Sequence, residues 1–325
     1  MKVMKIPDAL TGAIRQAESV LIVTHVSPDG DALGSSLALA RALVAMGKRV
    51  SLLNKDPVPR IYRFLPGWQD VSAQLPDAAE GTEPDALILL DCGELERTGF
   101  GTLPGRVKLV VDHHLTERSY GDIRWVRPEM SSTGEMVYSL IRALGAEIDT
   151  ETALCLYTAI FTDTGGFRYS SSTPSSFRAA ADLVELGVKP WSVTENVYES
   201  ISPARMKLMG MAINGMRFHG DVAVIVVTRD MYSETGTTDE DTENFANLAR
   251  SVQGVEVAVF IRQTGPESFK VSMRSKGRVN VAAIAETIRG GGHHNAAGGK
   301  MDGTLAEVEE RIVTALTNAR CDSQS

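Results

Sequence analysis

Cysteine is scarce in this sequence, and long apolar segments are missing from it. The three cysteines, Cys92, Cys155 and Cys321, are odd in number and far apart, and no two have the Cys-x-x-Cys spacing. This argues against a disulfide framework and against structural zinc. No apolar run approaches the roughly 18 to 20 residues that cross a bilayer, and the charged, amphipathic N-terminal segment lacks the apolar stretch of a signal peptide. These absences predict a cytoplasmic protein without membrane association.

An excess of positive charge is also missing. Lys and Arg total 33 against 41 Asp and Glu, which gives a formal charge of −8. This balance disfavours a protein that tracks long nucleic acids with an overall basic surface. It still allows a small anionic ligand in a local basic pocket. Residues 255–300 contain seven basic and three acidic residues, so positive charge is concentrated there.

The composition is otherwise that of a folded protein. Of the 325 residues, 43% are hydrophobic and 23% are charged, which excludes disordered and collagen-like classes. In the first half, short apolar runs alternate with helical patterns, as in parallel strands joined by crossover helices. We therefore predict an α/β fold with a mainly parallel sheet flanked by helices. Its predicted strands are residues 19–24, 49–53, 85–90 and 107–111, and its predicted helices are residues 33–46, 132–144 and 151–162.

The alternating pattern weakens after Gly187, where two prolines and the lack of a clear strand predict a linker. We expect a first domain over residues 1–187, a linker over 188–204 and a smaller second α/β domain over 205–325. The second domain has predicted strands at 222–228, 255–262 and 268–273, predicted helices at about 279–288 and 305–318, and a glycine-rich turn between those helices.

Acidic and histidine side chains follow several predicted strands of the first domain. Any one of these acids alone is explained as a helix cap or an Asx turn. The carboxyl ends of parallel strands, however, lie at one edge of a sheet, where ligands bind. Carboxylates and imidazoles crowded there need a compensating cation, and this ligand set suits Mn²⁺ or Mg²⁺, with the imidazoles favouring manganese. The residues are His25, Asp29, Asp31, Asp91, Asp112, His113, His114 and Asp163.

A second set of candidates lies in the second domain, where it would bind the rest of a substrate. A basic segment stands at the end of a predicted strand, with a solvated strand end as the alternative. The segment GGGHHNAAGG at 290–299 can bring backbone N–H groups close to phosphate, and its histidines can donate to phosphate or stack on a base. A flexible turn is the alternative there. The candidates are Arg274, Ser275, Lys276, Gly291, Gly292, His293 and His294.

At these positions the sequence resembles the DHH phosphoesterase superfamily, named for the triplet that stands here as Asp112-His113-His114. The resemblance includes His25-x3-Asp29-x-Asp31, then Asp91 and Asp163 in the same order, and covers nearly the whole chain. The segment 290–299 is similar to the signature of the companion DHHA1 domain. The resemblance implies an N-terminal DHH domain that holds metal ions and a C-terminal DHHA1 domain that binds the substrate.

The resemblance also implies a role for each residue of the first set. His25, Asp29 and Asp91 would hold one divalent ion, while Asp31, Asp91, His113 and Asp163 would hold another, with Asp91 shared. His114 would face the scissile phosphate and Asp112 would orient a ligand, so the predicted catalytic residues are His114, Asp91 and Asp112. Two such ions, Mn²⁺ with Mg²⁺ or Co²⁺ as alternatives, can lower the pKa of a shared water and stabilise both oxygens of an in-line displacement.

Within the superfamily we expect the stand-alone nanoRNase group of oligoribonucleases and 3'-phosphoadenosine-5'-phosphate (pAp) phosphatases. RecJ-like exonucleases usually carry additional nucleic-acid-binding domains, and the membrane-bound cyclic-dinucleotide phosphodiesterases carry transmembrane and sensory segments. Family II pyrophosphatases have a second domain without the GGGHH segment. The expected reaction is hydrolysis of RNA of two to five nucleotides to 5'-mononucleotides, or of pAp to AMP and phosphate. The resemblance also implies a homodimer.

Several alternatives stay open. Linear dinucleotides such as pApA or pGpG, or cyclic dinucleotides, are further short substrates. A RecJ-like single-strand exonuclease would act on longer chains, and its salt-dependent affinity would rise steeply with oligomer length. A nucleotide-sensing protein would only bind. A sensor has no need of two ions that share a carboxylate, so the complete set of acids and histidines argues for a hydrolase.

Overall fold

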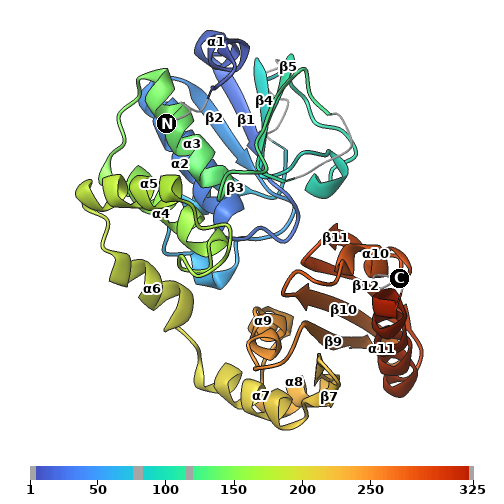
Figure 1. Cartoon of the computed structure of the whole chain (residues 1–325). Helices are drawn as coiled ribbons and strands as arrows, with labels where there is room; N and C mark the ends of the chain where they lie inside the picture. Colours follow the sequence, from blue (N-terminus) through green and yellow to red (C-terminus); the bar gives the residue numbers. More distant parts are fainter. Residues whose placement is uncertain (1–4, 76–82, 115–119, 322–325) are drawn as a thin grey trace. The chain divides into compact units, whose positions relative to one another are not determined.

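The structure, a computed structural model, describes residues 5–75, 83–114 and 120–321. The chain divides into two compact units, Met1–Ser200 and Ile201–Ser325 (Figure 1). Each unit has its own six-stranded sheet and its own hydrophobic core. The segment 188–204, expected as a linker, contains helix α6 (Pro190–Tyr198). The limits that we expect for the two domains stay a prediction.

Unit 1 contains a parallel sheet with the strand order β3-β2-β1-β4-β5-β6, which confirms the predicted fold class. From β1 the strand order runs to β2 and β3 on one side and to β4, β5 and β6 on the other. Open parallel sheets bind ligands at the point where the strand order reverses in this way. The elements of unit 1 are α1 (Asp8–Gln16), β1 (Ser19–Val23), α2 (Gly30–Ala45), β2 (Arg49–Leu53), β3 (Val71–Ser72), β4 (Ala86–Leu90), β5 (Val107–Asp112), β6 (Ile123–Val126), α3 (Thr133–Leu144), α4 (Thr150–Asp163), α5 (Pro174–Glu185) and α6.

Both faces of this sheet are buried, and helices cover one of them (Figure 1). Successive side chains of a strand point to opposite faces. In β1, Val20 and Ile22 belong to the large core shared with α1 to α4. Leu21 and Val23 belong to a smaller cluster that includes Leu103 from a loop. Burial on both faces explains why the strands stand out in the sequence as continuous apolar runs.

Three glycines let α2 and α3 pack closely against α4. A Cβ atom on Gly30 would collide with the side chain of Thr162, and one on Gly34 would collide with the carbonyl oxygen of Cys155. A Cβ atom on Gly134 would collide with that of Ala159. Because Gly30 and Gly134 lie in the first turns of their helices, this packing brings those turns to the C-terminal half of α4.

Unit 2 has a mixed sheet with the strand order β11-β12-β10-β9-β8-β7, in which only β8 and β9 are parallel. Helices α10 and α11 share a core with one face, and α7 and α9 share a core with the other. The elements are α7 (Pro203–Asn214), β7 (Arg217–His219), β8 (Val222–Val227), α8 (Arg229–Thr235), α9 (Phe245–Arg250), β9 (Val257–Gly265), β10 (Ser268–Ser275), α10 (Val281–Glu286), β11 (Gly291–His293), β12 (Ala296–Asp302) and α11 (Leu305–Cys321).

The glycine-rich segment corrects one prediction. We expected a turn, but Gly291 to His293 form β11 and pair with β12 as an antiparallel hairpin. Gly292 has a φ of +144°, and a Cβ atom there would lie 2.5 Å from the Cα atom of Ala297. Glycine is depleted in strands in general, so the many glycines of this segment did not predict a hairpin. The glycines of this segment are therefore used partly for close contact between backbones.

Two expectations about cysteines and membranes can be compared with the structure. Cys92 and Cys155 are free and buried, and the side chain of Cys321 lies outside the described residues. Of the helices in the described parts of the chain, none combines the length and the apolar character that crossing a membrane requires.

Candidate metal centre

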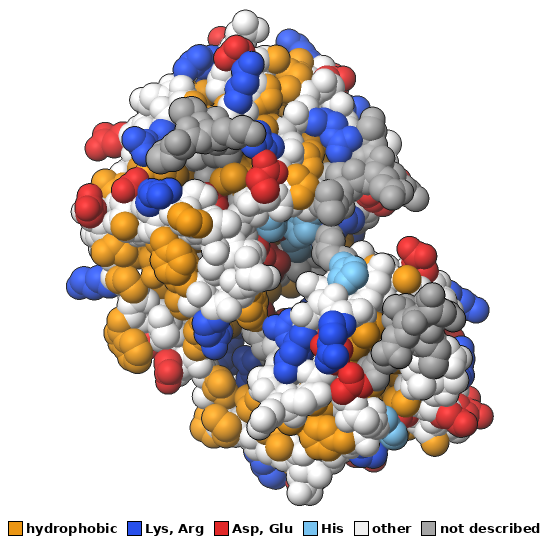
Figure 2. All heavy atoms as spheres, in the orientation of Figure 1, with side chains coloured by type: hydrophobic (Ala, Val, Ile, Leu, Met, Phe, Trp, Pro, Cys, Tyr) orange, Lys and Arg blue, Asp and Glu red, His pale blue; other side chains and the backbone are white. Residues whose placement is uncertain are grey.

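The predicted metal-binding residues lie at the carboxyl edge of the sheet in unit 1, at the point where its strand order reverses. His25 follows β1 by two residues and Asp91 directly follows β4, which pairs with β1. His113 directly follows β5. Asp31 lies in the first turn of α2 and Asp163 is the last residue of α4. In Figure 2, histidine side chains of unit 1 show at the surface next to acidic side chains.

The first group of ligands consists of His25, Asp29 and Asp91, whose ligand atoms all lie within 4.8 Å of one another. The Nε2 atom of His25 is 3.3 Å from Oδ2 of Asp91 and 3.9 Å from Oδ1 of Asp29. Asp29 also caps α2, because its Oδ1 accepts hydrogen bonds from the backbone N–H groups of Asp31 and Ala32 at 3.0 Å. Asp29 therefore caps helix α2 and also belongs to the first group of ligands.

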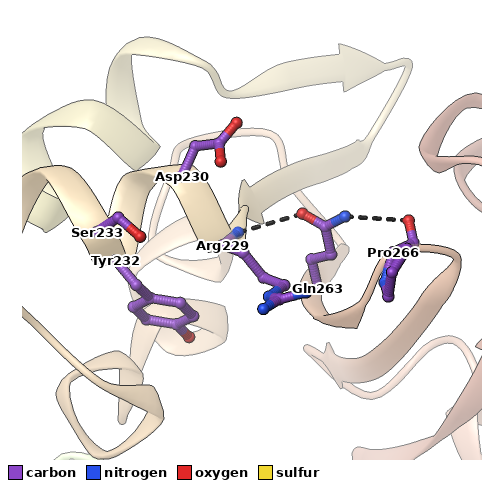
Figure 3. A pocket seen from close by; sticks show the side chains of 6 residues that line it. All are labelled: Arg229, Asp230, Tyr232, Ser233, Gln263 and Pro266. Atoms are coloured by element: carbon purple, nitrogen blue, oxygen red, sulfur yellow. Dashed lines mark hydrogen bonds between the residues drawn. The ribbon is translucent and has the colours of Figure 1, made fainter.

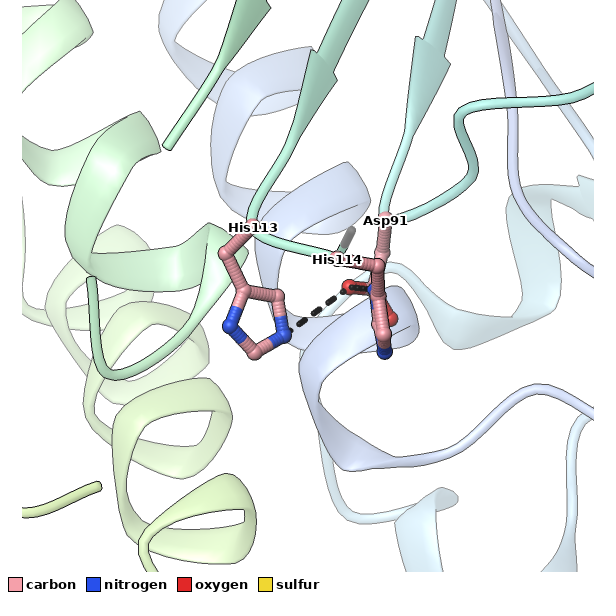
Figure 4. A group of neighbouring side chains, drawn as sticks. All are labelled: Asp91, His113 and His114. Carbon is pink, nitrogen blue, oxygen red and sulfur yellow. Dashed lines mark ion pairs between the residues drawn. The ribbon is translucent and has the colours of Figure 1, made fainter. Parts of the chain in front are cut away.

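The second group consists of Asp31, Asp91, His113 and Asp163. The Nε2 atom of His113 is 3.6 Å from one carboxylate oxygen of each of the three acids, and Figure 4 shows its ring turned towards Asp91. This nitrogen is buried and makes no hydrogen bond to the described residues, because 3.6 Å exceeds hydrogen-bonding distance. A buried nitrogen facing three carboxylates fits a divalent cation between them.

Asp91 belongs to both groups through different oxygen atoms. Its Oδ2 faces His25, while its Oδ1 faces His113 and lies 3.3 Å from Nδ1 of His114. The residue is 1% exposed and has a left-handed backbone with a φ of 57°. Such a conformation is unfavourable for a residue with a side chain and is concentrated at functional sites.

The remaining two residues of the set form a pair beside the second group. Oδ1 of Asp112 accepts hydrogen bonds from the backbone N–H of His114 at 3.0 Å and from its Nδ1 at 2.8 Å. Asp112 is fully buried. In this arrangement Nδ1 of His114 carries a proton and donates a hydrogen bond to Asp112, which fixes the orientation of the His114 ring.

The pKa values at this edge differ strongly between neighbouring groups. Burial lowers the pKa of His25 and that of His114, but Asp91 and its neighbours outweigh burial and raise the pKa of His25 to about 9 and that of His114 to about 11. Burial opposes ionisation of Asp91, yet the two histidines hold its pKa well below its usual range. Burial and the charge of Asp91 raise the pKa of Asp31, and burial raises that of Asp163 to about 6. Perturbed pKa values of this kind mark functional sites.

The start of α3 also belongs to the site and was not among the predicted residues. The hydroxyl of Thr133 donates to Oδ1 of Asp91 at 2.9 Å, and the backbone N–H groups of Thr133 and Gly134 donate to Asp31 at 2.7 and 2.8 Å. A signal was present, since Ser132-Thr133 followed by Glu135 is typical of a helix start. The missing information was strand β6, which places this helix start at the same edge of the sheet.

In unit 2 the basic segment of the predicted substrate site lies at the end of β10. Ser275 is buried, and its hydroxyl contacts Glu256 at 3.4 Å and accepts the N–H of Gly277 at 2.9 Å. Arg274 donates to the carbonyl of Met273 at 3.0 Å, and Nζ of Lys276 donates to that of Val252 at 3.3 Å. Lys and Arg side chains also gather on the visible face of unit 2 (Figure 2).

The structure brings the glycine–histidine hairpin next to this basic segment. Arg274 pairs with Ala296 of β12, and Nε2 of His294 lies 3.0 Å from the carbonyl oxygen of Gly277. Gly291 is exposed, and a Cβ atom there would have no neighbour within 4 Å. The side chain of His293 lies outside the described residues.

A hollow of about 540 Å³ lies elsewhere on unit 2, beside α8 (Figure 3). The side chain of Gln263 bridges the N–H of Arg229 and the carbonyl of Pro266 at its rim. Its lining includes none of the predicted site residues. The lining residues are Arg229, Asp230, Tyr232, Ser233, Gln263 and Pro266.

A parallel sheet with this edge of carboxylates and histidines, joined to a mixed-sheet second unit, defines a metal-dependent phosphoesterase. The chain belongs to the DHH family: the N-terminal domain of that family matches residues 19–160, and the DHHA1 domain matches residues 219–319.

Several curated relatives carry the name bifunctional oligoribonuclease and PAP phosphatase NrnA. The one from Thermus thermophilus is 39% identical over 299 residues, which cover 91% of this chain and 89% of the relative. The one from Bacillus subtilis is 26% identical and covers 90% and 94%. A crystal structure of an exopolyphosphatase-related protein from Bacteroides fragilis has a TM-score of 0.90 at 32% identity and covers 98% of this chain and 97% of that one.

Proposed function

We propose that this protein hydrolyses RNA of two to five nucleotides to 5'-mononucleotides, pAp to AMP and phosphate, or both. The observation that carries the proposal is the Asp91 carboxylate, whose two oxygens face two different ligand groups. Similarity over nine-tenths of the chain to a protein named oligoribonuclease and PAP phosphatase supports this choice of substrate within the family.

The ligand groups fit a pair of divalent ions, for which we propose Mn²⁺, with Mg²⁺ or Co²⁺ as alternatives. The first group, His25, Asp29 and Asp91, would hold one ion, and the second group would hold the other. Imidazole nitrogens in both groups favour manganese over magnesium. When bound, such a pair polarises a phosphoryl oxygen and lowers the pKa of a coordinated water.

His114 is proposed to bind the phosphate that is cleaved. In the metal-free protein Asp91 and Asp112 outweigh burial and raise the pKa of its ring, and a charged ring can stabilise charge that develops on the phosphoryl group. Asp112 holds Nδ1 at 2.8 Å, so the ring keeps one orientation while the substrate binds and leaves. Such positioning by a buried carboxylate is a general requirement of histidines at metal sites.

The second unit is proposed to bind the rest of the substrate. Arg274, Lys276, Gly291, Gly292, His293 and His294 would contact phosphate or base, while the buried Ser275 would support this region from within unit 2. Ser275 is 1% exposed, which suits this supporting role. A short basic segment fits short substrates, because longer strands need extended basic grooves and stacking platforms.

A comparison of substrates under Mn²⁺ tests the proposal. The panel is pAp, a dinucleotide, a five-nucleotide RNA, single-stranded DNA and pyrophosphate. We expect the highest kcat/KM for pAp or the short RNAs, and no hydrolysis by Asp91→Ala. A preference for long single strands or for pyrophosphate would contradict the proposal, and tight binding without hydrolysis would indicate a nucleotide sensor.

Location and assembly are also part of the proposal. We place the protein in the cytoplasm, in keeping with the free thiols of Cys92 and Cys155. We expect a homodimer, and light scattering coupled to size-exclusion chromatography measures its mass directly.

A further inference from the structure

The segment from Met130 to Gly134, which joins β6 to α3, contacts three ligands of the second group. The carbonyl oxygen of Met130 lies 3.3 Å from Nδ1 of His113. The Thr133 hydroxyl donates to Oδ1 of Asp91 at 2.9 Å. The N–H groups of Thr133 and Gly134 donate to the two oxygens of Asp31. One short segment thus touches ligands that come from α2, β4 and β5.

The ligands peculiar to the first group are held by their own loop. Nδ1 of His25 lies 2.8 Å from the carbonyl oxygen of Val26, and Asp29 accepts the N–H groups of Asp31 and Ala32. Asp91 belongs to both groups, and Asp29 of the first group also accepts the N–H of Asp31 of the second.

The supporting segment is itself rigid. Ser132 caps α3 by accepting the N–H of Glu135 at 3.0 Å. The carboxylate of Glu135 accepts the hydroxyl of Ser131 at 2.6 Å and its N–H at 3.2 Å. Ser131, Ser132 and Thr133 are fully buried, so breaking any of these bonds would leave a buried polar group without a partner, which is unfavourable.

Thr133 contacts the Asp91 oxygen that faces the second group. Its hydroxyl donates to Oδ1, which also faces His113, while Oδ2 faces His25. The left-handed backbone of Asp91 alone does not fix the carboxylate plane.

We propose that residues 130–134 are a positioning segment for the second group, and that the Thr133 hydroxyl sets the affinity of the ion held there without setting that of the first ion. The proposal rests on the metal pair of the proposed function. It assigns Thr133 a positioning role, since its hydroxyl and its N–H both bind proposed metal ligands.

The test measures Mn²⁺ binding to the metal-stripped full-length protein without substrate. Isothermal titration calorimetry gives the affinities, and electron paramagnetic resonance detects the spin-coupled Mn²⁺ pair. Thr133→Val removes the hydroxyl but keeps the backbone N–H that binds Asp31. We expect one of the two ions to bind about 10- to 100-fold more weakly, the coupled signal to be lost at limiting metal, and Thr133→Ser to restore both.

Thr158→Val is the matched control, because Thr158 is equally buried and its hydroxyl bonds only to the carbonyl of Leu154 within α4. It should bind both ions like the wild type. If Thr133→Val does not fold, Thr133→Ala makes the same comparison with a smaller side chain. Equal weakening of both ions, unchanged binding, or failure of serine to restore binding would overturn the proposal. Wild-type protein that binds two ions but cleaves no RNA or pAp would overturn the proposed function alone.

Discussion

The contacts of individual side chains at the sheet edge indicate different roles for them. Asp91 lies between two groups of ligands, whereas the buried carboxylate of Asp112 accepts hydrogen bonds from the backbone and the ring of His114. Two neighbouring acids of similar burial thus have different expected effects when substituted. Loss of Asp91 should remove metal, and loss of Asp112 should not.

For Asp112→Asn we expect kcat for short RNA to fall about 10- to 100-fold with bound Mn²⁺ unchanged. Asp112 helps to raise the pKa of His114 in the metal-free protein, so its removal should lower that pKa and change the pH–rate profile. Metal analysis and a pH–rate profile measure both effects. Asp182→Asn, which alters a surface acid bonded to Tyr138, is the control, and loss of metal from Asp112→Asn would contradict the assignment.

The pKa of His25 makes the stability of the metal-free protein depend on pH. Burial opposes the charge, but Asp91 and Asp29 raise the pKa to about 9, above the unfolded value of about 6.5. The charged ring therefore contributes stability that is fully present below about pH 6.5 and is lost as the pH rises through 9. We expect the Tm of EDTA-treated protein to fall over this interval, and to fall less in His25→Gln. An identical slope in both proteins would contradict the raised pKa.

Helices and strands were predictable where the pattern was local. The predicted strand 49–53 matches β2, and the predicted helix 132–144 matches α3 within one residue. The strands β6, β11 and β12 escaped, because β6 has four residues and the glycine-rich pair is stabilised by pairing with β10 and by backbone contact. Long-range pairing leaves little trace in the local pattern.

Two adjacent glycines of the hairpin are expected to differ when each is replaced by alanine. A Cβ atom at Gly292 would press on Ala297 from a φ of +144°, so Gly292→Ala should destabilise unit 2 by about 1–3 kcal/mol. Gly291 has open space, so Gly291→Ala should change stability by less than about 0.5 kcal/mol and raise KM for short RNA. Thermal denaturation and steady-state kinetics test this. An unchanged KM in Gly291→Ala would separate the hairpin from substrate binding.

At the scale of the whole molecule, every residue of both ligand groups belongs to unit 1. Ligand binding stabilises the part of a protein that binds, by about 2.7 kcal/mol at 100 times Kd. In calorimetry we expect Mn²⁺ to raise the unfolding transition of unit 1 and EDTA to lower it, with the transition of unit 2 unmoved. Asp91→Ala should show no response, and a shift of both transitions would contradict this.

The site residues that belong to a sequence motif could be predicted. The contacts that depend on the fold could not. His25, Asp91 and His113 follow strands whose ends meet, and this could be predicted from the order of the elements. The bond from Thr133 to Asp31 joins residues 102 positions apart, and no local pattern connects them. Two-domain architecture followed from the change in pattern after Gly187.

The two units have separate cores and hold separate sets of the proposed residues. In the proposed function, ion binding and nucleotide recognition therefore belong to different parts of the chain. A descendant could exchange the C-terminal piece for another and acquire a new substrate while its hydrolytic chemistry stayed as it was.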